Sequence, residues 1–177
     1  MSVSSSLEER NKSLPVSMPV AVIMERREST TIWADEVWTA VGVTGDTQSD
    51  TDEQVDARVI NDQSDMKQVL YSGFNITLYV DECESYYHNI ILPDPGIYVI
   101  TRDNDDGVPV PYIVTPSFDE ANAYLECEGE AFTVPMPPEL YIWMEEFVLQ
   151  NYMPEKRVKR KRKDWRKEGH EGPGFKL

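Results

Sequence analysis

The segment from Ile76 to Arg102 constrains the fold most, because it predicts a strand, a helix, a turn and a second strand in succession. From residue 76 to 80, apolar and polar side chains alternate with the period of a half-buried strand. Asp81 suits a helix N-cap, and apolar residues then recur at helical spacing up to residue 91. Pro93 and Pro95 end this helix, and the β-branched residues at 97–101 predict the next strand.

Two earlier stretches of apolar residues, 20–24 and 32–43, are separated by a polar turn and predict a β-hairpin. Trp33 and Trp38 lie in the second stretch. We interpret them as packing residues rather than a binding surface, because aromatic side chains dominate the cores of small domains. A strand at 69–71 that turns at Ser72–Gly73 into the strand at Phe74 is expected to form another hairpin. Order is expected to begin near Val16.

The second half of the chain repeats the order of strand, helix and strand. Residues 110–115 predict a strand, and Pro109 and Pro111 indicate that it is an edge strand or begins late, because proline cannot donate to a ladder. Ser117 and Glu120 form the capping box of a short helix, which a strand at 132–134 follows. This pattern echoes residues 76–102 at an offset of 38 residues. Either two equivalent units stand on one sheet, or chance or shared capping chemistry explains the echo equally well.

The longest helix is predicted to start at Pro137–Pro138, and Pro154 ends the domain. Its apolar stripe consists of Leu140, Trp143, Met144, Phe147 and Val148. We therefore predict an α+β fold, with an antiparallel or mixed sheet of about six strands, two short helices and a longer C-terminal helix packed on the sheet. Residues 16–154 form the single domain, with an acidic loop at 44–56. Residues 1–15 and 155–177 are expected to be disordered.

Charge is divided unevenly along the chain, whose net charge is −15. Residues 155–177 contain ten Lys or Arg against four Asp or Glu, so this tail carries +6 and residues 1–154 carry −21. An acidic body repels nucleic acids and anionic membranes, which leaves the tail as the electrostatic route to such partners. No apolar run is long enough for a transmembrane helix, and no export signal is recognisable, so a cytoplasmic protein without membrane contact is expected.

Few residues in the predicted domain are suited to catalysis or metal binding. His88 is the only histidine before the tail, and Cys83 lies five residues away, so the two do not share a helical face. Cys83 and Cys127 are too few for a zinc site and are expected to be reduced thiols. The Asp residues of the acidic loop lack EF-hand spacing, and no glycine-rich phosphate loop occurs. We therefore expect no cofactor, no metal and no enzymatic activity.

The tail is the sharpest candidate for binding, because it combines clustered cations with one aromatic residue. Its candidate residues are Lys156, Arg157, Lys159, Arg160, Lys161, Arg162, Lys163 and Trp165. They can bind the phosphates of a nucleic acid, pair with an acidic protein, or fold back on the acidic residues of 1–154. Docking on the body, or a tail that merely raises solubility, explains the pattern at least as well as nucleic-acid binding does.

Several motifs, in order, resemble a small uncharacterised proteobacterial family whose genes lie beside those of molybdenum-dependent formate dehydrogenases. They are MPVAVIMERR at 18–27, Trp33 and Trp38 followed by VGV at 41–43, LYVDECESYYHN at 78–89, YVITR at 98–102, PMPPE at 135–139 and KRKRKD at 159–164. The acidic insertion and the residues after 164 lie outside the resemblance. The family brings no assigned activity, so it implies no catalytic residue.

The resemblance implies a non-enzymatic accessory or maturation factor whose partner is a formate dehydrogenase subunit or its maturation machinery. Under this hypothesis the tail, or Arg26 and Arg27, engages the apoenzyme or an anionic pterin cofactor. The alternative function is a nucleic-acid-binding or regulatory module that acts through the basic tail.

Overall fold

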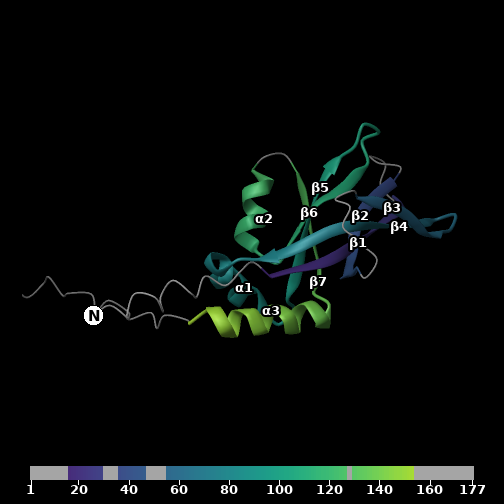
Figure 1. The fold of residues 1–177 in the computed structure, drawn as a ribbon. Coiled ribbons are helices and arrows are strands. Elements are labelled where there is room, and N and C mark those ends of the chain that lie inside the picture. The colour runs from purple at the N-terminus through teal and green to yellow at the C-terminus, as the bar shows by residue number, and fades with distance from the viewer. Residues whose placement is uncertain (1–15, 30–35, 47–54, 127–128, 154–177) are drawn as a thin grey trace, which may run out of the picture.

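The computed structural model describes residues 16–29, 36–46, 55–126 and 129–153. Over these residues the chain forms two antiparallel sheets and three α-helices, so the predicted α+β class is confirmed. Figure 1 shows α2 beside the second sheet and α3 along the opposite side of the molecule. The first strand of the described part begins at Val16.

The first sheet has four strands in the order β2-β1-β4-β3. They are β1 (Val16–Glu28), β2 (Glu36–Gly45), β3 (Asp56–Asp62) and β4 (Met66–Leu78). The predicted first hairpin is confirmed, because β1 pairs antiparallel with β2. The predicted acidic loop is shorter than expected, since Thr44 and Gly45 continue β2 and Asp56 opens β3. Its residues 47–54 lie outside the described part.

The predicted turn at Ser72–Gly73 is wrong, because β4 runs straight through these residues. Gly73 has a φ of 95°, and the register between β1 and β4 shifts at this point. A glycine with positive φ serves a β-bulge as well as a turn, which explains the mistaken prediction. The turn of this hairpin lies at residues 63–65 instead, where Gln63 N–H donates to the Met66 carbonyl at 2.8 Å.

The second sheet contains β5 (Gly96–Asp103), β6 (Pro109–Thr115) and β7 (Glu130–Pro135) in the order β6-β5-β7. The predicted single sheet of about six strands is therefore wrong. β6 is an edge strand, as its prolines predicted. The two units of the sequence echo do not share one sheet, because β4 belongs to the first sheet and β6 to the second.

The helices are α1 (Cys83–Ile90), α2 (Phe118–Leu125) and α3 (Pro138–Asn151). The predicted cap of α2 is confirmed, because Ser117 Oγ accepts a hydrogen bond from Glu120 N–H at 3.1 Å. The predicted N-cap Asp81 is wrong. A 3₁₀ turn, η2 (Val80–Glu82), precedes α1, and the Tyr79 carbonyl accepts from Glu82 N–H at 3.2 Å, so Asp81 lies inside this turn.

The hydrophobic core lies between the two sheets, α1 and α3. Its largest fully buried side chains are Tyr86, Met24, Ile76, Leu78, Ile97, Ile100, Leu140 and Met144. Tyr86 meets Phe147 edge-on at 6.4 Å, and its hydroxyl accepts from Tyr79 N–H at 3.3 Å. The predicted stripe of α3 is buried except for Trp143, which is half-buried against the core. Burying each such apolar side chain contributes about 1.5–3 kcal/mol.

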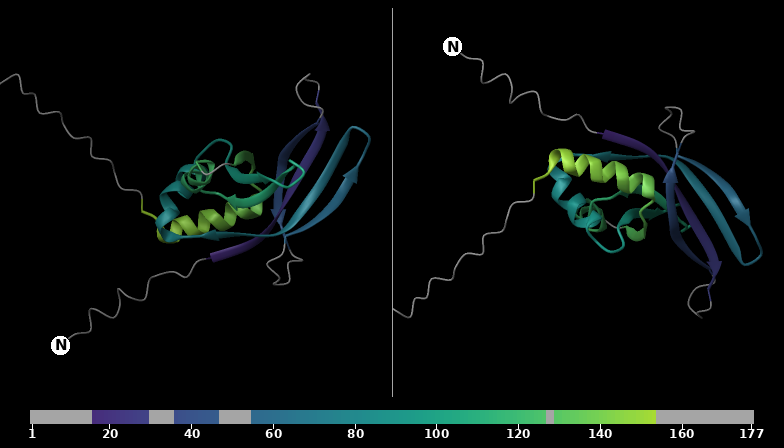
Figure 2. Two further views of the ribbon diagram at one scale, coloured as in Figure 1. Left: turned by 90° about the horizontal axis from the view of Figure 1, so that it is seen from above. Right: turned by 90° about the horizontal axis from the view of Figure 1, so that it is seen from below.

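Figure 2 shows that α3 and the second sheet pack near one end of the four-stranded sheet, while its other end projects beyond them. Asn89 of α1 ties the packed end together through three hydrogen bonds. Its Nδ2 donates to the carbonyls of Gly96 and Pro116 at 2.8 and 2.7 Å, and its Oδ1 accepts from Gly96 N–H at 3.0 Å. This buried amide joins α1 to the start of β5 and to the end of β6.

Candidate functional site

A groove lies between β4 and β6 where the described chain leaves two strand edges open. β1 pairs with β4 up to Leu78, whereas β3 pairs with the other side of β4 only up to Ser72. Residues 73–78 therefore have a strand neighbour on one side only within the described ranges. β6 is one of the two edge strands of the second sheet and faces this open stretch.

The groove has a volume of about 320 Å³. Phe74 and Val114, both buried, contribute apolar surface. Asn75, Tyr79 and Tyr112 contribute more polar and more exposed surface, and the two tyrosines are nearly half exposed. Such a mixture of an apolar base with a few polar groups is typical of a binding cleft.

Pro19 shows which way the backbone groups of the open stretch point. In an antiparallel pair, opposite residues either exchange both hydrogen bonds or make none, and the two kinds alternate. Pro19 lies opposite Asn75, has no N–H, and accepts from Asp46 N–H at 3.0 Å on its β2 side. The pair is therefore non-bonded, so the N–H and C=O of Asn75 point away from β1 into the groove. The same holds for Thr77, two residues further along.

The opposite wall offers a backbone edge as well. Gly96 uses its N–H and C=O for Asn89, on the side of β5 that faces β6. Because these groups alternate sides along a strand, Tyr98 also faces β6 and forms a bonded pair with Thr115. Val114, the next residue of β6, must then direct its N–H and C=O away from β5. Among the described residues, both walls thus present backbone groups that pair with no strand, and such groups need hydrogen-bond partners wherever water is excluded.

Side chains at the rim of the groove are held by neighbours. The guanidinium of Arg102 lies 3.6 Å from the ring centre of Tyr112, and Tyr124 of α2 meets the same ring edge-on. Glu120 accepts a hydrogen bond from Thr115 Oγ1 at 2.5 Å. The rim is therefore largely preformed before anything binds.

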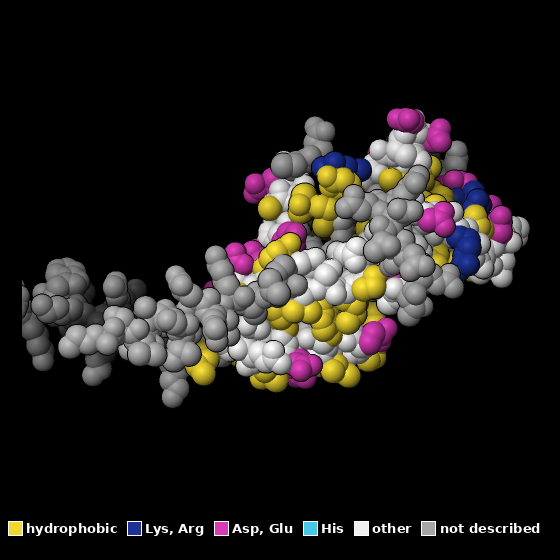
Figure 3. Space-filling model, in the orientation of Figure 1, with side chains coloured by type: hydrophobic (Ala, Val, Ile, Leu, Met, Phe, Trp, Pro, Cys, Tyr) yellow, Lys and Arg dark blue, Asp and Glu magenta, His cyan; other side chains and the backbone are white. Residues whose placement is uncertain are grey.

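Glu120 is the one charged residue among the described residues that line the groove, while the guanidinium of Arg102 lies over Tyr112 at its rim. A second carboxylate, Glu82, is held nearby by Ser117 Oγ at 2.8 Å. Ser117 Oγ also accepts a hydrogen bond from the backbone N–H of Glu120 at 3.1 Å. Figure 3 shows Asp and Glu side chains scattered over the visible face and Lys and Arg at few places. A cationic occupant therefore suits both the groove and its surroundings.

Comparison with known proteins places the chain in a family. One family model, described as a protein of unknown function (DUF3305), matches residues 19–163, which is most of the chain. The chain belongs to the DUF3305 family. No curated protein and no solved structure matches it.

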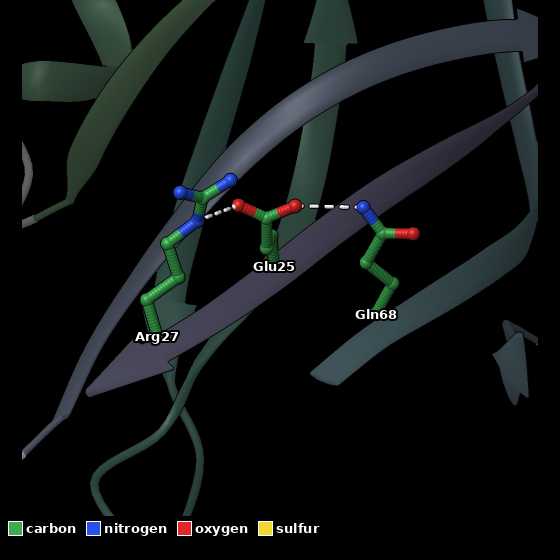
Figure 4. Close-up of polar contacts among 3 residues, drawn as sticks. All are labelled: Glu25, Arg27 and Gln68. Carbon is green, nitrogen blue, oxygen red and sulfur yellow. Dashed lines mark hydrogen bonds and ion pairs between the residues drawn. The ribbon is translucent and has the colours of Figure 1, made fainter. Parts of the chain in front are cut away.

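Two residues predicted to bind a partner lie at the other end of β1 from the groove of this DUF3305 protein. Arg26 forms an ion pair with Glu36 at 2.7 Å, and Arg27 pairs with Glu25. Figure 4 shows Glu25 between Arg27 and Gln68, whose Nε2 donates to Glu25 at 2.6 Å. The bonds from Gln68 and Arg27 hold the pKa of Glu25 below its ordinary value. Both arginines are thus engaged within the sheet.

The remaining predicted binding residues belong to the tail and lie outside the described residues, as do Trp33 and Cys127. Trp38 packs against the core, in agreement with its interpretation as a packing residue. His88 is exposed and lies 3.8 Å from Glu84, while Cys83 is buried. Burial, followed by the charge of Asp81, raises the pKa of the Cys83 thiol.

No cluster of three or more His, Cys, Asp or Glu residues in the described ranges is placed to hold a metal ion. Within the same ranges, no helix combines the length and the apolar character that a bilayer crossing requires.

Sequence reasoning missed the groove, although prolines carried part of the signal. Pro109 and Pro111 marked β6 as an edge strand. The described length of β3, which leaves half of β4 without a second strand neighbour among the described residues, has no local signature in the sequence.

Proposed function

We propose that this protein is a non-enzymatic accessory or maturation factor of a molybdenum-dependent formate dehydrogenase. It acts in the cytoplasm by holding a segment of a formate dehydrogenase subunit, or of the maturation machinery, in the groove between β4 and β6. The proposed link to a formate dehydrogenase, called the enzyme context below, rests on the resemblance of the sequence motifs. The binding mode rests on the groove.

The observation that carries the binding mode is the pair of open backbone edges. Asn75 and Thr77 on one wall, and Val114 on the other, direct N–H and C=O groups into the same space. Unpaired strand edges are a liability that proteins usually cover or guard with charge. The outer edge strand β3 carries Asp56, Arg58 and Asp62, whereas the open half of β4 has no charged residue. A strand edge without charged residues, in a protein that is otherwise acidic, is suited to pairing with a specific partner.

A deletion strain tests the enzyme context. Loss of the gene is expected to lower formate dehydrogenase activity and the molybdenum content of the enzyme, and the wild-type gene is expected to restore both. Normal activity and normal molybdenum content in the deletion strain would overturn the proposal.

Complementation with groove variants tests the binding mode. Thr77→Pro removes a backbone N–H that faces the groove, and Thr77→Val retains it as a matched control. The first variant is expected to restore less activity than the second, and to retain less formate dehydrogenase when tagged protein is isolated from cells grown on formate. Equal restoration by both variants would count against the groove.

The alternative function rests on the charge of the tail, +6 over residues 155–177. Under this alternative the protein retains labelled RNA or DNA in a salt-sensitive manner, and deletion of residues 155–177 abolishes retention. Absence of retention at near-physiological salt would remove it.

A further inference from the structure

We infer that the groove binds an extended, cationic segment of a partner polypeptide as an additional strand, antiparallel to β4 and in line with β3. This inference rests on the proposed function and specifies the chemistry of the segment that is bound.

The position and direction of the added strand follow from the pairing of β3 with β4. β3 occupies the outer side of β4 from Lys67 to Ser72 and runs antiparallel to it. Beyond Gly73 the same side stays open within the described residues, and Asn75 and Thr77 direct their backbone groups there. A segment of about five residues in the antiparallel direction would span this edge, given a rise near 3.4 Å per residue. It would lie end to end with β3, short of Val55, which lines the groove just before that strand. Pairing with an exposed sheet edge is the usual geometry of strand addition.

The side-chain pattern of the bound segment follows from the surfaces on the two faces of an added strand, one apolar and one polar. Alternate residues of an added strand would face Phe74 and Val114, which are buried and apolar, and small apolar side chains suit them. The intervening residues would face the rim around Asn75 and Tyr79. A segment that alternates apolar and polar residues is therefore preferred over a uniformly charged one.

The negative charge of the protein favours a bound segment that carries a basic residue. Glu120 lines the groove with its Oε2 held by Thr115 Oγ1, and residues 1–154 carry a charge of −21. A lysine or arginine of the bound segment would meet an anchored carboxylate, which adds specificity and speeds encounter. A second copy of the acidic body carries the same sign of charge, so a separate basic segment fits better.

Fluorescence anisotropy of the full chain with a defined probe tests the inference. The probe is a short labelled peptide of alternating valine and threonine with one central lysine. A second probe has glutamate in place of lysine, and a third is N-methylated on one set of alternate amides. The lysine probe is expected to bind, and the glutamate probe to bind at least about threefold more weakly. Methylation on the set that faces β4 is expected to abolish binding.

Protein variants with matched controls locate the binding. Thr77→Pro is expected to weaken binding of the lysine probe about three- to tenfold more than Thr77→Val, which keeps the backbone N–H. Glu120→Gln is expected to weaken it about threefold, while Asp119→Asn removes the same charge one residue away without effect. Glu120→Lys is expected to reverse the preference between the lysine and glutamate probes.

Three results would overturn the inference: no binding of the lysine probe, equal loss in Asp119→Asn and Glu120→Gln, or a concentration-dependent dimer that is lost in Thr77→Pro. The last result would assign the groove to a second copy of this chain. Failure of the peptide tests with a clear deletion phenotype would refute the strand mode alone. Probe binding without a phenotype would refute the enzyme context alone.

Discussion

Proline substitutions on β4 test directly whether backbone groups point into the groove. The residue next to Thr77 is Ile76, which is 1% exposed and lies opposite Met18 of β1. The alternation argued above makes the Ile76–Met18 pair a bonded one. Proline at 76 therefore removes a ladder hydrogen bond, whereas proline at 77 removes an N–H that has no strand partner among the described residues.

The expected magnitudes separate the two positions clearly. Each proline variant is compared with the alanine variant at the same position, so that loss of the side chain cancels. At Ile76 the excess cost of proline is expected to be about 1–3 kcal/mol, because the Met18 carbonyl loses its donor inside the sheet. At Thr77 the excess is expected to lie within about 0.5 kcal/mol of zero.

Urea unfolding followed by tryptophan fluorescence measures these free energies, with Trp38 and Trp143 as internal reporters. The m-values of the four variants must agree for the comparison to hold. An excess cost at Thr77 equal to or larger than that at Ile76 would refute the assignment of the groove-facing edge. The peptide-binding inference would then lose its geometric basis.

The remaining predictions concern the fold around the groove. Replacing Asn89 with alanine leaves three backbone groups without partners and is expected to lower the free energy of unfolding by about 2–4 kcal/mol, whereas Asn122→Ala changes it by under about 0.5 kcal/mol in the same urea assay. The lowered pKa of Glu25 stabilises the fold above the ordinary value of 4.5, and this contribution disappears as the pH falls through the folded-state pKa. The difference in stability between the wild type and Glu25→Gln is thus expected to be largest at neutral pH and to shrink below about pH 4.5; a pH-independent difference would contradict this. Because its pKa is raised, the buried Cys83 thiol in a Cys127→Ser background is expected to react much more slowly with a disulfide reagent at pH 8 in the folded protein than in urea, and equal rates would count against its burial.

The elements that sequence reasoning predicted correctly are those set by local chemistry. Ser117 caps α2 because a hydroxyl three residues before a backbone N–H needs no distant partner. The apolar stripe of α3 and the edge character given to β6 by Pro109 and Pro111 are equally local. These signals survive in any tertiary context that leaves the element intact.

The sequence predictions were wrong where one local pattern is compatible with two structures, or where the strand pairing is non-local. Ser72–Gly73 fits a tight turn and a bulge equally well, and the long pairing of β4 with β1 decides for the bulge. Asp81 suits the start of an α-helix, but it lies inside the 3₁₀ turn that precedes α1. The division into two sheets depends on which strands meet, and no window of sequence contains that information.

The uneven cover of the four-stranded sheet has a consequence for how firmly a bound segment would be held. The end near Leu78 lies under α1, α3 and the second sheet, while the end near Met66 projects away from them. Local opening is cheapest where few apolar contacts must break. Among the amide protons of β4 that bond to β1, those before Gly73 should therefore exchange with deuterium faster than those after it. A bound segment would lie along the half of the strand that opens least, so its release would not follow the frequent fluctuations at the exposed tip.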